Sequence, residues 1–101
     1  MDLNPLTPMM RRAILEYVAG ENRNGRRPEG VEIALNVAKR LMLTIEQPLI
    51  QLYKMVQAGL IERNELVGGF NDDNWHTVTS QGYERLRQLI SQLDSSPRNA
   101  R

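Results

Sequence analysis

The sequence predicts a mainly α-helical domain with one small antiparallel β-hairpin. Apolar residues recur at the three- and four-residue spacing of a helix face in four stretches, and a cluster of turn formers separates two runs rich in strand formers. The chain has 101 residues, a length that suits one hydrophobic core. We therefore expect a single domain over residues 1–94, followed by a flexible polar tail over residues 95–101.

The first two helices are predicted over residues 8–19 and 31–42. Thr7-Pro8 has the form of a helix start, because a Thr oxygen accepts a free backbone N–H and Pro is tolerated in the first turn. Gly20 supplies the expected stop of the first helix. Residues 21–30, which contain two Gly and one Pro, are predicted to form a solvated loop.

The third helix is predicted to begin at Thr44, where Thr-Ile-Glu-Gln matches a capping box. Pro48 then lies in the first turn, where its missing N–H costs little. One face of this helix is apolar and the opposite face carries long polar side chains. The apolar stripe consists of Ile45, Leu49, Leu52 and Val56, with Met55 beside it. The polar set, which we expect to face solvent, consists of Gln47, Gln51 and Lys54.

A hairpin and a fourth helix complete the predicted order. Strands are expected over residues 60–67 and 75–79, joined by a Gly- and Asp-rich turn, and Thr79-Ser80 offers an N-cap to a helix over residues 80–93. His76 alternates with Val78 on the second strand, so the two should share a face. A lone His there is interpreted as a partly buried structural residue rather than as a base or a metal ligand.

The order helix, helix, short turn, helix, hairpin, helix resembles the winged helix-turn-helix, with a three-helix core, a wing and a C-terminal helix. Three segments are similar to this superfamily, particularly to MarR- and PadR-like bacterial regulators. They are residues 44–52 as the recognition helix, Gln57-Ala58-Gly59-Leu60-Ile61-Glu62 as its exit into the wing, and Val78-Thr79-Ser80-Gln81-Gly82 as the return. The resemblance covers residues 7–93 and implies the fold more specifically than the function, because winged helices serve many tasks.

The resemblance implies that the third helix enters the major groove of double-stranded DNA and places Gln47, Gln51 and Lys54 at base edges and phosphates. Gln can bond adenine at two points, and Lys can reach guanine acceptors or a phosphate. The other interpretation is an ordinary solvated helix face, which Gln and Lys also populate.

Basic residues concentrate between Arg11 and Arg27, where five Arg stand against two Glu. This concentration could supply the salt-sensitive, sequence-independent part of DNA affinity, or it could simply keep the loop soluble. The predicted phosphate contacts are Arg23, Arg26, Arg27, Lys39 and Arg40.

The predicted wing favours a different function. Its turn carries Asp72 and Asp73, which repel phosphate, whereas a wing that contacts DNA normally carries Lys or Arg. Phe70 and Trp75 beside this turn could anchor a protein partner, or Trp75 could cover the edge of the core. The alternative to a DNA-binding transcription regulator is therefore a protein–protein interaction module that docks through the wing or the C-terminal helix without binding DNA.

The C-terminal helix carries more apolar surface than one small domain covers easily, in Leu86, Leu89, Ile90 and Leu93. A homodimer would bury the excess and hold two recognition helices one DNA turn apart. In the competing arrangement this helix packs wholly against the first helix of the same chain.

Composition excludes several other classes. The chain has no Cys, which excludes disulfides, thiolate metal clusters and cysteine nucleophiles, and its net charge of +1 neither requires nor forbids a nucleic-acid partner. Ser80, His76 and Asp72 name the members of a hydrolase triad, but no oxyanion turn accompanies them. We therefore expect no enzymatic activity and no cofactor.

The apolar runs are too short to span a membrane, and the N-terminus lacks the pattern of a secretory signal, so we expect a cytoplasmic protein.

Overall fold

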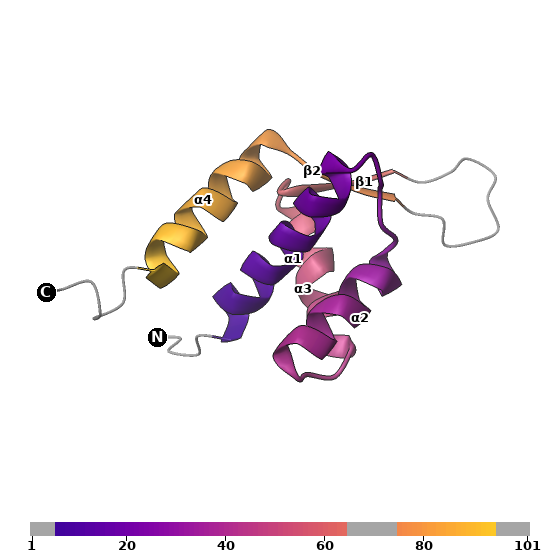
Figure 1. Ribbon diagram of the computed structural model, residues 1–101, viewed down its shortest axis with the longest axis vertical. Coiled ribbons are helices and arrows are strands. Elements are labelled where there is room, and N and C mark those ends of the chain that lie inside the picture. Colours follow the sequence, from indigo (N-terminus) through magenta and orange to yellow (C-terminus); the bar gives the residue numbers. More distant parts are fainter. Residues whose placement is uncertain (1–5, 65–74, 95–101) are drawn as a thin grey trace, which may run out of the picture.

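The computed structural model describes residues 6–64 and 75–94, which form four helices and a two-stranded antiparallel sheet (Figure 1). This confirms the predicted fold class. The elements are α1 Leu6–Arg23, α2 Gly30–Leu41, α3 Glu46–Gln57, β1 Ile61–Asn64, β2 Trp75–Val78 and α4 Ser80–Asp94. The predicted wing turn with Phe70, Asp72 and Asp73 lies outside the described residues, as do the predicted tail and the side chains of Trp75 and Leu93.

α1 lies at the centre of the fold and contacts α2, α3, α4 and β2 (Figure 1). Its apolar face is completely buried at Ile14, Leu15 and Val18. The other elements pack around this face, and burial of such large aliphatic side chains is the main source of stability in a domain of this size. The core cluster also contains Ile33, Val37, Leu52, Met55, Leu60, Ile61, Val78 and Leu89.

The predicted stop of α1 at Gly20 is wrong, because the helix continues to Arg23. Its last turn is fixed from outside by Asn22, whose side-chain amide donates to the His76 carbonyl at 3.2 Å and whose amide oxygen accepts the Val78 N–H at 2.9 Å. The turn is made instead by Gly25, which has a φ of 80° that a residue without a Cβ adopts at little cost. Tertiary hydrogen bonds thus extend the helix past the first Gly.

Asn22 and Pro28 together close the outer edge of β2. The His76 N–H donates to the Pro28 carbonyl at 3.1 Å, and the His76 Nδ1 lies 3.0 Å from the same oxygen. His76 and Val78 are both buried, at 2% and 6% exposure, which confirms that they share the inward face of the strand. The wing is therefore anchored to the end of α1 and to the loop that follows it.

The connection from α2 to α3 is short and turns at Met42, which adopts a left-handed φ of 58° while its side chain is 91% exposed. The Leu43 N–H donates to the Ala38 carbonyl at 2.8 Å. The predicted capping box at Thr44 is wrong: α3 begins at Glu46, and no side-chain cap precedes it. Reciprocal capping geometry occurs at α2, where the Glu29 N–H donates to the Glu32 carboxylate at 3.4 Å.

The hairpin leads directly into α4. β1 and β2 pair with Ile61 opposite Val78. The Thr79 hydroxyl accepts the Gly82 N–H at 3.0 Å, which confirms the predicted N-cap. The same hydroxyl lies 3.0 Å from the Leu60 carbonyl, so the start of α4 is fixed to the end of the connection that follows α3.

Candidate nucleic-acid interface

α3 has one buried face and one uncovered face. The buried side chains are Pro48, Gln51, Leu52 and Met55, which face α1, α2 and the sheet. The opposite face is exposed along its whole length, at Glu46, Gln47, Ile50, Tyr53, Lys54 and Gln57. We call these six residues the outward face of α3. In a helix-turn-helix this is the surface that is free to enter a groove of DNA.

The prediction that Gln51 faces solvent is wrong. Gln51 is only 8% exposed, and its amide oxygen accepts a hydrogen bond from the Arg11 Nε of α1 at 3.0 Å. The buried face is rotated by about 80° from the predicted apolar stripe, at the ~100° per residue of an α-helix. Because α1 crosses α3 on the side of Met55, the core takes Met55 and Gln51 in place of Ile45 and Val56, which remain half-buried. Gln51 is therefore a packing residue.

The rotation brings Ile50 to the centre of the outward face, opposite the core. Its side chain is 54% exposed, and that of Tyr53 is 58% exposed. Gln47 and Lys54 lie at one margin of this face, both exposed as predicted. Ile50 and Tyr53 belong to neither the predicted apolar stripe nor the predicted polar set, so the sequence analysis does not identify them. Pro48 and Met55 are seven residues apart, as are Leu49 and Val56 of the predicted stripe, so spacing alone does not distinguish the two stripes.

The predicted basic cluster is divided by the structure. Arg11 and Arg12 are half-buried and engaged within the helices, Arg11 with Gln51 and Arg12 with Glu16 at 3.0 Å. The predicted phosphate contacts are exposed and lie near the two opposite ends of α2. Arg23, Arg26 and Arg27 lie at the end of α1 and in the loop before α2, and Lys39 and Arg40 lie in the last turn of α2, near the start of α3.

Glu16 holds α1 against the end of α2. Its carboxylate accepts from Arg12 at 3.0 Å and from Arg40 at 2.8 Å. Partial burial raises the pKa of Glu16, but the hydrogen bonds from Arg40 and Arg12 and their charges outweigh it, so the pKa is lowered overall. Arg40 is thus half-exposed but already neutralised by a carboxylate, which weakens it as a phosphate contact relative to Lys39.

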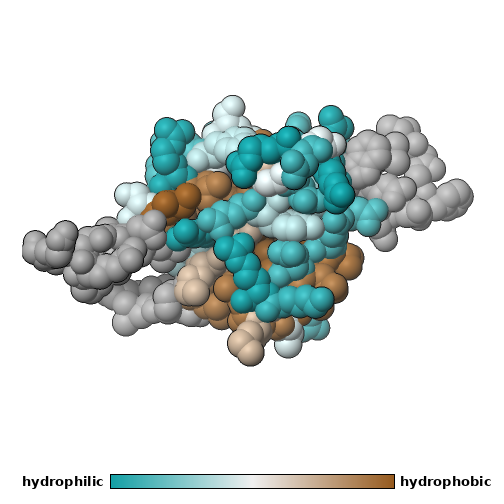
Figure 2. Space-filling model, in the orientation of Figure 1, coloured by the Kyte–Doolittle hydropathy of each residue, from teal (hydrophilic) through white to brown (hydrophobic). Residues whose placement is uncertain are grey.

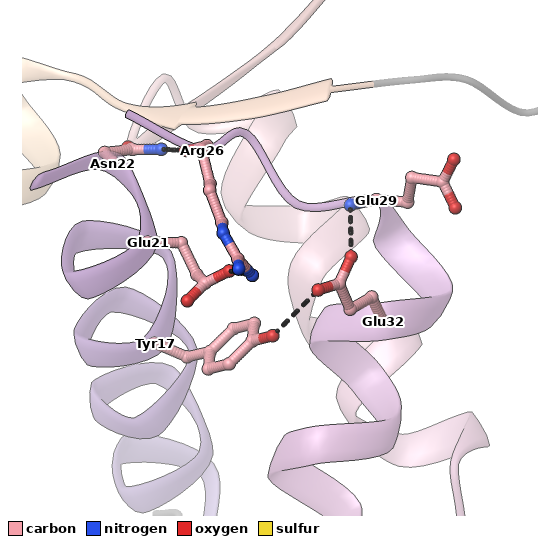
Figure 3. A network of polar contacts seen from close by, with 6 residues as sticks. All are labelled: Tyr17, Glu21, Asn22, Arg26, Glu29 and Glu32. Carbon is pink, nitrogen blue, oxygen red and sulfur yellow. Dashed lines mark hydrogen bonds and ion pairs between the residues drawn. The ribbon is translucent and has the colours of Figure 1, made fainter. Parts of the chain in front are cut away.

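Carboxylates also surround the loop before α2 (Figure 3). Arg26 pairs with Glu21 at 3.4 Å, and its carbonyl accepts from Asn22 at 2.8 Å. The Tyr17 hydroxyl donates to Glu32 at 3.1 Å. Burial, together with the hydrogen bond to the Glu32 carboxylate, raises the pKa of Tyr17 to about 12. This network fixes the loop in place, and it makes the local field less positive than the arginine count alone implies.

An open groove of about 450 Å³ lies between α3, the start of α2 and the hairpin. Leu49, Leu52 and Val56 of α3 contribute apolar lining, and Arg63 and His76 contribute polar lining from β1 and β2. In the part of the chain that the structure describes, no group of three or more His, Asp or Glu residues is placed to hold a metal ion. Among the same residues, no helix has both the length and the apolar character needed to cross a membrane.

The elements together have the winged helix-turn-helix architecture: α1, α2 and α3 are the three-helix core, and β1 and β2 form the wing. No model of a known protein family matches the sequence, and neither does any curated protein. Among solved structures, the chain is similar to the crystal structure of SSV1 F-93, with a TM-score of 0.57, 85% of this chain and 87% of that chain covered, and 9% sequence identity. At this identity the likeness shows the fold alone, and nothing in it is specific to MarR- or PadR-like regulators.

Proposed function

We propose that the chain is a DNA-binding transcription regulator of the MarR- and PadR-like kind, which seats α3 in the major groove of double-stranded DNA. One observation carries this proposal: the outward face of α3 is uncovered from Gln47 to Gln57 within a winged-helix frame. Such a protein acts in the cytoplasm by occupying a promoter, so it requires neither a catalytic residue nor a cofactor.

The exposed polar residues divide into two roles. Gln47, in the first turn of α3, is placed to bond an adenine edge, because N-terminal residues of a recognition helix contact bases. Lys54 lies two turns further along the same margin and is assigned to phosphate or to a guanine. Gln51 has no part in this set, since its amide oxygen is held by Arg11 in the interior.

Phosphate contacts are assigned to the exposed basic residues that flank the helix-turn-helix, which are Arg23, Arg26, Arg27, Lys39 and Arg40. Arg26 is 70% exposed, and its pair with Glu21 is a surface ion pair. Such pairs contribute only ~0–1 kcal/mol, so exchange of the carboxylate for a phosphate costs little. Release of counterions by these contacts would supply most of the affinity.

Dimerisation through α4 is part of the proposal. Leu89 is buried against the core, whereas Leu86 and Ile90 are half-buried and Tyr83 is 39% exposed. α4 therefore packs on α1, as in the competing single-chain arrangement, but keeps apolar surface for a second copy. Sedimentation equilibrium at several protein concentrations tests this: a homodimer that Tyr83→Glu dissociates supports it, and a monomer throughout contradicts it.

The test of DNA binding is titration of a fluorescent random-sequence duplex at several salt concentrations. We expect steep salt dependence, and a slope of log affinity against log salt that is shallower by about one in Lys54→Ala and in Arg26→Ala. Arg87→Ala is the matched control, because Arg87 lies on α4, its side chain is 75% exposed, and it forms a surface ion pair with Glu84 at 3.4 Å. Absence of binding at low salt contradicts the proposal, and unchanged slopes contradict the assigned contacts.

A second candidate function is favoured by apolar surface. Val31 and Leu35 of α2 are 57% and 46% exposed, and Val31 lines the same groove as Tyr53 of α3. Figure 2 shows hydrophobic side chains over α2 and beside α4 on an otherwise largely hydrophilic face. Exposed aromatic and aliphatic side chains of this kind are typical of protein interfaces, so a protein–protein interaction module is the alternative that the same titration selects if no duplex binds.

A further inference from the structure

Ile50 lies on the outward face of α3, about 30° around the helix axis from the direction opposite the buried residues. The four buried residues of the helix centre on the opposite side, at the ~100° per residue of an α-helix. Ile50 is in the second turn of α3 and Gln47 is in the first, so the two side chains lie one turn apart on the outward face. Its side chain has no hydrogen-bonding group, and at 54% exposure it is not required to fill the core.

We propose that Ile50 is a specificity-determining residue that reads the 5-methyl group of thymine. The inference rests on the proposed function, since it requires α3 to lie in a major groove. There, thymine is the base that presents an apolar group, whereas guanine, adenine and cytosine present donors or acceptors. An aliphatic side chain packed against a polar base edge would displace the water bound to that edge without replacing its hydrogen bonds. The contact therefore discriminates against the other bases.

Gln47 and Ile50 together define the preferred site. Three residues along a helix advance ~4.5 Å, which is comparable to the 3.4 Å between successive base pairs. Gln47 suits adenine and Ile50 suits thymine, so the two side chains read the same A·T pair or adjacent pairs. The preferred duplex therefore carries A·T pairs where α3 enters the major groove, and their thymine methyl groups carry part of the sequence information.

The experiment compares two duplexes of alternating sequence, one with adenine and thymine and the other with adenine and uracil in place of thymine. They have the same hydrogen-bonding groups and differ in the 5-methyl group. We expect the chain to bind the thymine duplex about fourfold more tightly for each methyl group contacted, the factor that corresponds to ~0.8 kcal/mol for one buried methyl group. Fluorescence anisotropy at one fixed salt concentration measures both affinities.

Two variants assign the effect to Ile50. Ile50→Ala is expected to bind both duplexes equally, with the affinity that the unchanged chain has for the uracil duplex. Leu35→Ala is the control: Leu35 is also an exposed aliphatic residue, on α2, and its variant is expected to keep the thymine preference. Far-UV circular dichroism confirms that both variants are folded, as expected for side chains that are about half-exposed.

Each outcome decides between the two proposals. Equal affinity of the unchanged chain for both duplexes overturns the role of Ile50 and leaves DNA binding intact. A thymine preference that persists in Ile50→Ala also overturns it, because another residue or the shape of the duplex then detects the methyl group. Absence of salt-dependent binding to either duplex overturns the proposed function, and the inference with it.

Discussion

Gly82 lies where the first turn of α4 crosses the connection between α3 and β1. A Cβ added at this position would overlap the Leu60 carbonyl oxygen and would lie 2.7 Å from Cγ1 of Val78. Neither neighbour can yield easily, since one is backbone and the other belongs to a side chain that is 6% exposed. We predict that Gly82→Ala destabilises the fold even though Ala is the better helix former.

The magnitude follows from the groups that must move. Overpacking of this kind costs ~1–3 kcal/mol. The Leu60 carbonyl also accepts the Thr79 N–H at 3.1 Å, and loss of this hydrogen bond costs ~1 kcal/mol. The higher helix propensity of Ala offsets ~1 kcal/mol of this loss. The free energy of unfolding should therefore fall by ~1–3 kcal/mol, which corresponds to ~5–20 °C in Tm for a domain of this size.

Urea denaturation followed by circular dichroism measures the change, and Gly20→Ala is the matched control. Gly20 lies inside α1, and the nearest atom to an added Cβ is the Arg23 Nη2 at 3.9 Å. Gly20→Ala should therefore raise the free energy of unfolding by up to ~1 kcal/mol. If Gly82→Ala proves as stable as the unchanged chain, the close approach of α4 to Leu60 is refuted.

Three further variants test other features of the fold. Met42→Gly should raise the free energy of unfolding by ~1 kcal/mol in the same assay, because Met42 has a left-handed φ of 58° that favours Gly and its side chain is exposed. A lower free energy of unfolding would contradict backbone strain at this residue. Asn22→Ala should lower it by ~2–4 kcal/mol, since hydrogen bonds to the His76 carbonyl and the Val78 N–H are lost, whereas Asn24→Ala, in an exposed turn, should change little. Glu16→Gln should reduce the loss of unfolding free energy between neutral and acidic pH. Because the pKa of Glu16 is lowered in the fold, its carboxylate contributes stability above its ordinary pKa of 4.5, and this contribution is lost as the pH falls. An unchanged dependence of the unfolding free energy on pH would exclude the contribution.

The order of elements could be predicted because its signals are local. The apolar periodicity of the helices, the Thr79 cap and the turn formers between the strands each act within a few residues, and the structure confirms the four helices and the hairpin. The end of α1 could not be predicted in this way. It is set by Asn22, which is hydrogen-bonded to residues 54 and 56 positions away along the chain.

The candidate site was predicted only in part for a related physical reason. α3 has two adjacent apolar stripes, and its sequence does not say which one α1 will cover. The structure selects the stripe that includes Met55, with Gln51 accommodated in the interior by the Arg11 guanidinium. Gln47 and Lys54 are exposed under either choice, whereas the positions of Gln51 and Ile50 change with a rotation of about 80°. The DNA contacts assigned to these residues stay predictions.

The closed outer edge of β2 has a consequence for the behaviour of the protein in concentrated solution. A strand at the border of a sheet presents unpaired amides that invite strands from other molecules, and this is a common start of aggregation. Here the His76 N–H, the His76 carbonyl and the Val78 N–H already have partners in Pro28 and Asn22. Another chain could add to this edge only by displacing those partners first, so the loop before α2 protects the sheet from uncontrolled assembly.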